Sequence, residues 1–163
     1  MIQLRKVGPE ERSLLWNIHQ KYLYEMTHYY DNEMDGEGNY HYGYFDAYFR
    51  EPARTALLIC RDDTLAGFAM INPYSYIGAH PDHVRAEFTI FPAFRRKHIG
   101  FNAAALILAS FPGSWEIKYN EKNTGAKALW NRVTEPFQPV RHPYSDVETV
   151  LAFTTARTTP ENA

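Results

Sequence analysis

The chain has 163 residues, a hydrophobic content of 45%, a charged content of 22%, one cysteine and a formal net charge of −2. A chain of this length can bury most of its apolar surface without disulfides or metals, so the composition predicts a soluble globular protein. The weak net charge argues against broad nucleic-acid affinity, and no apolar run approaches a membrane span or the core of a signal peptide, so we expect a cytoplasmic protein without nucleic-acid or membrane partners.

Two patterns divide the chain into strands and helices. Runs that alternate apolar and polar residues predict strands, apolar residues three and four apart predict helices, and glycine and proline mark the boundaries. In chain order they predict a strand over 2–7, helices over 9–27 and 42–50, strands over 55–60, 65–72 and 85–91, a helix over 99–111, a strand over 115–119, a helix over 123–133, and strands over 138–141 and 147–154. We expect residues 1–155 to form a single domain and residues 156–163 to be a disordered tail.

A basic loop, residues 95–98, separates the strand over 85–91 from an alanine-rich helix, and Gly100 allows the backbone to approach a ligand closely. The first turn of a helix has four backbone N–H groups without partners and the positive end of the helix dipole. Strand, basic loop and helix in this order therefore predict an anion site. The alternative interpretation is a surface turn whose charges are solvated.

Two short motifs resemble those of the GNAT-type N-acetyltransferase superfamily. Arg95-x-x-His98-x-Gly100 is similar to the family's phosphate-binding loop [Q/R]-x-x-G-x-[G/A], with histidine in place of one glycine. Residues 123–130 are similar to its N-x-x-A-x-x-[L/F]-Y signature, with tryptophan in place of tyrosine. The resemblance implies a mixed α/β fold with about four helices and a mostly antiparallel sheet of six or seven strands, in which the central fourth and fifth strands splay apart.

The resemblance also implies acetyl-coenzyme A as co-substrate, bound in the wedge between the splayed strands. Backbone groups around Ile90 would hold the pantetheine arm, and amides of residues 96–101 would hold the pyrophosphate. The cofactor-binding residues expected on this basis are Ile90, Arg95, Arg96, Lys97, His98, Ile99, Gly100, Phe101, Asn123 and Ala126. Asn123 also suits a plain helix N-cap. Histidine at position 98 would cost about 1–2 kcal/mol if that position needs a positive φ.

Acetyl transfer to an amine needs a general base, because a protonated nitrogen has no lone pair to attack the thioester. Glu87 matches the place where many family members keep a glutamate on the fourth strand, and the alternative is a solvent-facing residue. Its basicity would have to come from burial or a relaying water. Many members protonate the departing thiolate with a tyrosine where this chain has Trp130, so Tyr119 is the substitute if its side chain faces the thioester.

The segment over residues 22–49 is unusually rich in tyrosines and acids. In the family this segment lines the acceptor site. Aromatic faces and carboxylates both attract a cation, so we expect a primary amine that carries a further positive charge. The alternative is that the tyrosines belong to the core and the acids to a solvated loop. The acids are Glu25, Asp31, Glu33, Asp35, Glu37 and Asp46.

The sequence thus predicts an N-acetyltransferase that moves an acetyl group from acetyl-coenzyme A to an amine of a small molecule or peptide by direct attack. The alternative, favoured by Trp130, is a GNAT-like module that binds an acyl-coenzyme A without turnover, as a sensor or partner-binding subunit. His80 and His83 lack the ligand count of a metal site, so we expect no metal. The oligomeric state stays open, a homodimer included.

Overall fold

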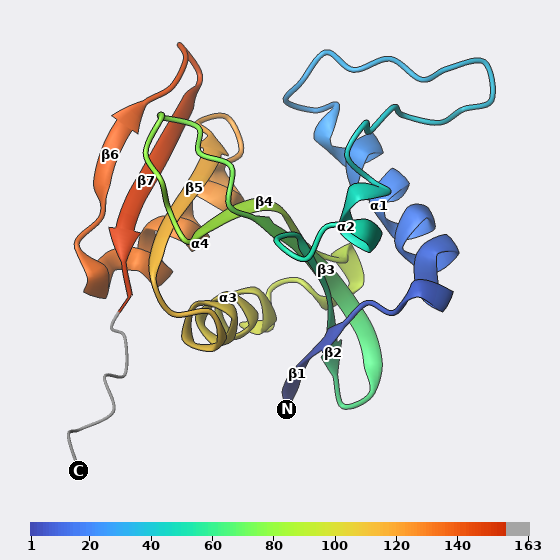
Figure 1. The fold of residues 1–163 in the computed structure, drawn as a ribbon, viewed down its shortest axis with the longest axis horizontal. Coiled ribbons are helices and arrows are strands. Elements are labelled where there is room, and N and C mark those ends of the chain that lie inside the picture. Colours follow the sequence, from blue (N-terminus) through green and yellow to red (C-terminus); the bar gives the residue numbers. More distant parts are fainter. Residues whose placement is uncertain (156–163) are drawn as a thin grey trace.

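The computed structural model describes residues 1–155, so the predicted tail over 156–163 lies outside the described residues. Within them seven strands form one sheet in the order β1-β2-β3-β4-β5-β7-β6, and β4–β5 is its one parallel pair (Figure 1). The predicted mixed α/β class and mostly antiparallel sheet are confirmed. The strands are β1 (Ile2–Lys6), β2 (Thr55–Arg61), β3 (Thr64–Asn72), β4 (His83–Ile90), β5 (Ser114–Asn120), β6 (Val140–Pro143) and β7 (Glu148–Thr154).

Four α-helices occur in the described part of the chain: α1 (Arg12–Met26), α2 (Ala47–Arg50), α3 (Ile99–Ser110) and α4 (Thr124–Thr134). None of them is long and apolar enough to cross a membrane. The prediction of a helix over 42–50 is wrong for its first five residues. The Gln20 side chain bonds both backbone groups of Tyr40, at 2.6 and 2.8 Å, and the chain then forms turns around Gly43 before α2 begins.

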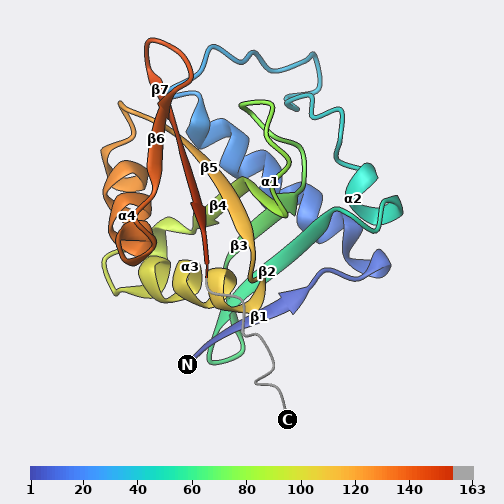
Figure 2. The ribbon, with the colours of Figure 1, turned by 60° about the vertical axis from the view of Figure 1, so that its left-hand side comes forward.

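The helices cover the sheet on both faces (Figure 2). Because successive strand residues point to opposite faces, Leu57 and Ile59 pack on one side of β2 and Leu58 on the other. The first side forms a core with α3 and α4, and the second forms a core with α1 and α2. The sheet therefore separates α3 and α4 from α1 and α2.

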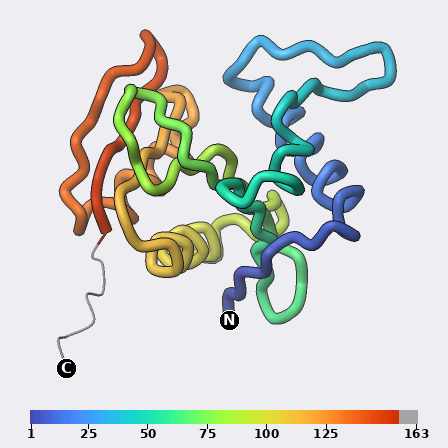
Figure 3. Tube along the Cα trace, in the orientation of Figure 1, coloured from blue at the N-terminus to red at the C-terminus, as the bar shows by residue number. Residues whose placement is uncertain are grey.

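The central strands diverge, as predicted (Figure 3). β4 pairs with β5 over His83–Arg85 against Trp115–Ile117, and no further pairing between them occurs within residues 1–155. A bulge accompanies the separation, because Ile71 of β3 faces Arg85 while the adjacent Met70 faces Glu87. The second half of β4 is thus left with one edge unpaired, which opens a wedge in the sheet.

Candidate active site

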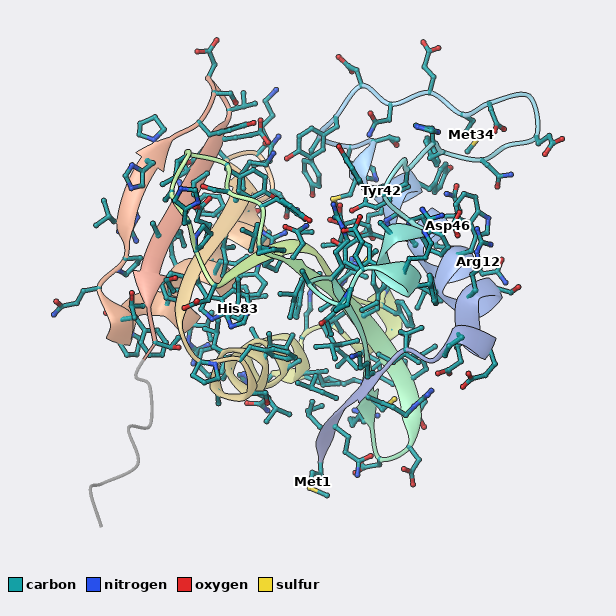
Figure 4. All side chains as sticks on the ribbon, viewed as in Figure 1. Met1, Arg12, Met34, Tyr42, Asp46 and His83 are labelled. Atoms are coloured by element: carbon teal, nitrogen blue, oxygen red, sulfur yellow. The ribbon has the colours of Figure 1, made fainter. Side chains whose placement is uncertain are left out.

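A cavity of about 1580 Å³ occupies the wedge between β4 and β5. Its walls come from α1, the loop that follows α1, β4, the basic loop, β5 and the start of α4. The loop over residues 27–46 runs above α1, with Met34 near its outer end (Figure 4). The cavity therefore connects the tyrosine-rich segment to the N-terminus of α3.

The basic loop leads into α3 through two left-handed residues. Arg96 has φ 64° and His98, the N-cap of α3, has φ 59°. Position 98 therefore does need a positive φ, which explains the glycine of the resembling motif and implies a strain of about 1–2 kcal/mol for histidine. The first intrahelical bond runs from the Asn102 amide to the His98 carbonyl at 3.1 Å, so the amides before it are free to bind an anion.

The cationic side chains of the loop differ in what they contact. Arg95 donates from Nε to the Ile90 carbonyl at 2.7 Å and from its terminal nitrogens to Glu25 at 2.6 and 3.0 Å. Its side chain is thus tied to α1 and β4. Arg96 and Lys97 are exposed, and neither has an ion pair with a residue in the described range.

The other expected cofactor residues divide into backbone and side-chain candidates. Ile99 is buried in the core, so it can offer its amide alone. Gly100 lines the cavity, and a Cβ there would meet the Ile90 side chain at 3.6 Å, an ordinary contact. Asn123 caps α4 by accepting from the Ala126 amide at 3.1 Å, and both residues line the cavity. The side-chain oxygen of Asn123 therefore serves as the N-cap of α4, as the alternative interpretation expected.

Glu87 lies on the part of β4 that pairs with β3 but not with β5. Its side chain lines the cavity and is partly exposed. Burial raises the pKa of its carboxyl group, and hydrogen bonding from Tyr22, the charge of Arg85 and hydrogen bonding from Tyr42 oppose that rise. A carboxylate with a raised pKa is a better base.

Tyrosines surround this carboxylate. Burial raises the pKa of Tyr22, Tyr42 and Tyr76, and the negative charge of Glu87 adds to the rise. Burial raises the pKa of Tyr30 to about 12, helped by Glu148, to which its hydroxyl donates at 3.0 Å. All four hydroxyls therefore stay protonated near neutral pH, and the single hydrogen of the Tyr30 hydroxyl is used by Glu148.

Tyr119 and Trp130 both line the cavity from the α4 side. The Tyr119 hydroxyl accepts a hydrogen bond from Asn131 Nδ2 at 3.1 Å, which leaves its own hydrogen free to be donated. Trp130 is buried edge-on against Phe88, with ring centroids 5.0 Å apart. Its place is that of a packing residue beside the wedge.

The acids of the tyrosine-rich segment prove to have different environments. Glu25 binds Arg95, Asp46 pairs with Arg12 at 2.7 Å away from the cavity (Figure 4), and Asp35 accepts from backbone amides of its own loop. Asp31 and Glu33 are exposed and line the cavity. The solvated-loop interpretation thus accounts for part of the segment. Asp31 and Glu33 remain as negative charges at the mouth of the cavity.

The cavity residues that the sequence analysis did not identify include Arg85, Lys118 and Asn120. Lys118 and Asn120 alternate on β5, so a shared face was readable from the sequence, but the face that meets the cavity depends on where the strands separate. Arg85 comes two residues before Glu87, and the bulge between them is not encoded in any local pattern. No cluster of three or more potential metal ligands occurs among the described residues.

A model of the acetyltransferase (GNAT) family matches residues 15–134 of this chain. No curated protein matches its sequence. A GNAT acetyltransferase from Streptococcus agalactiae is similar in structure, with 14% identity, 96% of both chains covered and a TM-score of 0.69. Spermidine N-acetyltransferase from Vibrio cholerae, in complex with CoA and spermine, has 12% identity, coverage of 94% of this chain and 95% of that chain, and a TM-score of 0.64. The ribosomal-protein-S18-alanine N-acetyltransferase of Escherichia coli has 11% identity, coverage of 100% and 99%, and a TM-score of 0.62.

Proposed function

Because this chain belongs to the acetyltransferase (GNAT) family, we propose that it is an N-acetyltransferase that moves the acetyl group of acetyl-coenzyme A to a primary amine by direct attack. The acceptor in this proposal is a small molecule or peptide with a positive charge besides the reacting amine. The observation that carries the proposal is Glu87, a carboxylate of raised pKa in the cavity that joins the tyrosine-rich segment to the N-terminus of α3.

The α3 end of the cavity is the proposed binding site for coenzyme A. The amides of Ile99, Gly100 and Phe101 stand before the first intrahelical bond and would bind the pyrophosphate. Arg96 and Lys97 add exposed positive charge there, whereas Arg95 stays with Glu25 and holds the loop against α1. We assign to Arg95 the role of positioning the basic loop and the Ile90 carbonyl. We assign pyrophosphate binding to the first turn of α3.

The proton and electron movements of the proposed reaction balance within the cavity. The neutral amine nitrogen forms a bond to the thioester carbonyl carbon, the carbon–sulfur bond breaks, and the coenzyme A thiolate leaves. Glu87 accepts the amine proton, directly or through a water. Tyr119 is the candidate donor to the thiolate, because its oxygen accepts from Asn131 while its own hydrogen is free to be donated. A proton then passes from Glu87 to Tyr119 through solvent, which restores both groups for the next turnover.

The charge at the cavity mouth supports a cationic acceptor. Asp31 and Glu33 line it beside Tyr29 and Tyr30, and aromatic faces together with carboxylates attract a cation. The Vibrio cholerae neighbour was solved in complex with CoA and spermine, so a protein of this fold binds both CoA and a polycationic amine. We extend that chemistry to this chain as part of the proposal.

The test is thiol release from acetyl-coenzyme A over a panel of amines. Glu87→Gln keeps the shape of the side chain but removes its basicity, so we expect turnover to fall by about 10²–10⁴-fold. Glu37→Gln, which changes an exposed glutamate outside the cavity lining, is the matched control and should retain full turnover. Normal turnover by Glu87→Gln would show that another group takes the proton.

The alternative, an acyl-coenzyme A-binding module without turnover, is favoured by Trp130 in the usual tyrosine position. The same assay separates the two functions when the melting temperature is measured with and without coenzyme A. An enzyme gives both thiol release and a melting shift, because a ligand that binds the folded state stabilises it. A binding module gives the shift with no thiol release for any amine.

A further inference from the structure

Two buried donors in the cavity have no partner. Among residues 1–155, the fully buried side-chain nitrogens and oxygens without a hydrogen bond are Nε of Arg85, Nδ2 of Asn120 and the two ring nitrogens of His19. Arg85 is 8% exposed and Asn120 is 3% exposed, and both line the cavity. Buried polar groups are normally hydrogen-bonded, so two unpartnered N–H donors in one cavity point to a ligand that accepts hydrogen bonds there.

Arg85 is held in place, but no carboxylate forms an ion pair with it among the described residues. It is the last residue of β4 that pairs with β5, and its guanidinium donates to the Lys118 carbonyl across the start of the wedge. The guanidinium also lies over the Trp130 ring, 5.1 Å from its centre. The charge of Arg85 opposes the rise in the pKa of Glu87 that burial causes, so Glu87 balances this cation in part but does not pair with it directly, and a bound anion would supply the direct partner.

Asn120 is oriented toward the same space. Its Oδ1 accepts from the Lys122 amide at 2.9 Å, which fixes the side-chain amide and turns Nδ2 away from that loop. Hydrogen bonding from the Asn120 amide and the charge of Arg85 both oppose the rise in the pKa of Tyr30, so the two groups lie near the same hydroxyl. Lys118 on the same face of β5 is already balanced by Glu148, at 3.2 Å.

We propose that Arg85 and Asn120 bind a carboxylate of the acceptor, so that the acceptor is an amino-acid-like molecule with both an amine and a carboxylate. This inference rests on the proposed function. A carboxylate fits because it brings one negative charge and two acceptor oxygens to one cation without an ion pair and one amide donor. A phosphate dianion would leave excess negative charge buried near Glu87. The acidic mouth adds the preference for a further cation, as in a basic amino acid.

The test compares amino acids with their carboxamides, which differ at the carboxylate alone. In the wild-type protein, lysine and arginine should be acetylated with kcat/KM about 10- to 100-fold higher than lysinamide and argininamide, because a site built for a charged group discriminates against the analogue that lacks it. Asn120→Asp keeps the oxygen that accepts from Lys122 and replaces the donor by a negative oxygen. It should remove the preference by raising KM for the acids while the carboxamides keep their values.

Arg85→Lys provides a second variant that keeps the charge and loses the planar donor set. We expect a smaller rise in KM for the acids, with kcat retained. Arg61→Gln, an arginine outside the cavity lining, is the matched control and should keep the wild-type preference. If Arg85 instead serves the thioester itself, Arg85→Lys will lower kcat equally for acids and carboxamides, and that result overturns the inference.

A binding measurement separates this inference from the proposed function. Calorimetric titration of lysine and lysinamide into the protein saturated with coenzyme A reports acceptor binding without turnover. If no amine is acetylated yet lysine binds more tightly than lysinamide and Asn120→Asp abolishes the difference, the proposed function fails and the carboxylate site stands. Equal binding of the acid and carboxamide forms to the wild-type protein overturns the carboxylate site, whatever the turnover.

Discussion

His19 should make the stability of this protein sensitive to acid. Its side chain is fully buried in α1, and neither ring nitrogen has a hydrogen-bond partner. Aromatic rings enclose it, with centroid distances of 4.3 Å to Tyr42 and 5.9 Å to both Phe45 and Phe68. Burial in this apolar cage lowers the pKa of His19 to about 4. The charged form is thus excluded from the folded state near neutral pH.

The size of the effect follows from proton linkage. An unfolded histidine has a pKa of about 6.5, so between pH 6.5 and pH 4 the unfolded chain binds more protons at this position than the folded chain does. The free energy of unfolding therefore falls as the pH drops through this window and levels off below it. From pH 7 to pH 5 the loss is about 2 kcal/mol, out of a total that is typically about 5–15 kcal/mol.

The assay is urea unfolding of wild type and His19→Leu at pH 7, 6 and 5. Leucine has a similar volume and no titratable group, so the variant should lose about 2 kcal/mol less than wild type over this range, since all other titrating groups are shared. His80→Leu, which removes an exposed histidine, is the matched control. Parallel pH dependences for wild type and His19→Leu would refute the reasoning, because His19 would then titrate alike in both states.

Further predictions concern the cofactor loop and the cavity mouth. His98→Gly removes the backbone strain of a histidine in the left-handed conformation, so the free energy of unfolding in urea should rise by up to about 1 kcal/mol. An unchanged free energy of unfolding would mean that the loop is not strained in solution. Gly100→Val should abolish the rise in melting temperature that coenzyme A gives. An unchanged rise would contradict the assignment of the basic loop to pyrophosphate binding. Asp31→Asn with Glu33→Gln should raise KM for a cationic amine at low salt and not at high salt, because attraction between exposed charges is screened beyond about 10 Å at 0.1 M; a difference that persists in high salt would contradict this.

The fold was predictable because its strands and helices have distinct periods. The alternation in β2 places Leu57 and Leu58 on opposite faces, and both faces are covered as that pattern requires. The prediction that the fourth and fifth strands splay apart came from the family resemblance and not from periodicity. The predicted helix fails over residues 42–46 because of a contact between distant residues. The Gln20 side chain of α1 bonds the backbone of Tyr40, and the chain then turns before α2 begins.

The candidate site was predictable where a motif marks it and not where distant residues meet. The loop before α3 has a motif, and Glu87 was assigned from the place on the fourth strand where many family members keep a glutamate. Glu25, in contrast, was assigned to an acceptor mouth, but it is bound by Arg95, 70 residues away in sequence. Arg85 could not be recognised, because its unpartnered nitrogen results from the separation of β4 and β5.

The structure also changes which charges can select an acceptor. With Glu25 neutralising Arg95, the contrast between a negative mouth and a positive loop reduces to exposed groups such as Asp31 and Arg96. Exposed charges contribute little to affinity and are screened by salt, so they act mainly on the rate of encounter. Arg85 and Asn120 are buried and each has one nitrogen without a hydrogen-bond partner, and discrimination by buried donors is far larger because a wrong ligand leaves them unpaired. Salt should therefore alter how fast acceptors bind, and these two residues should decide which acceptor is used.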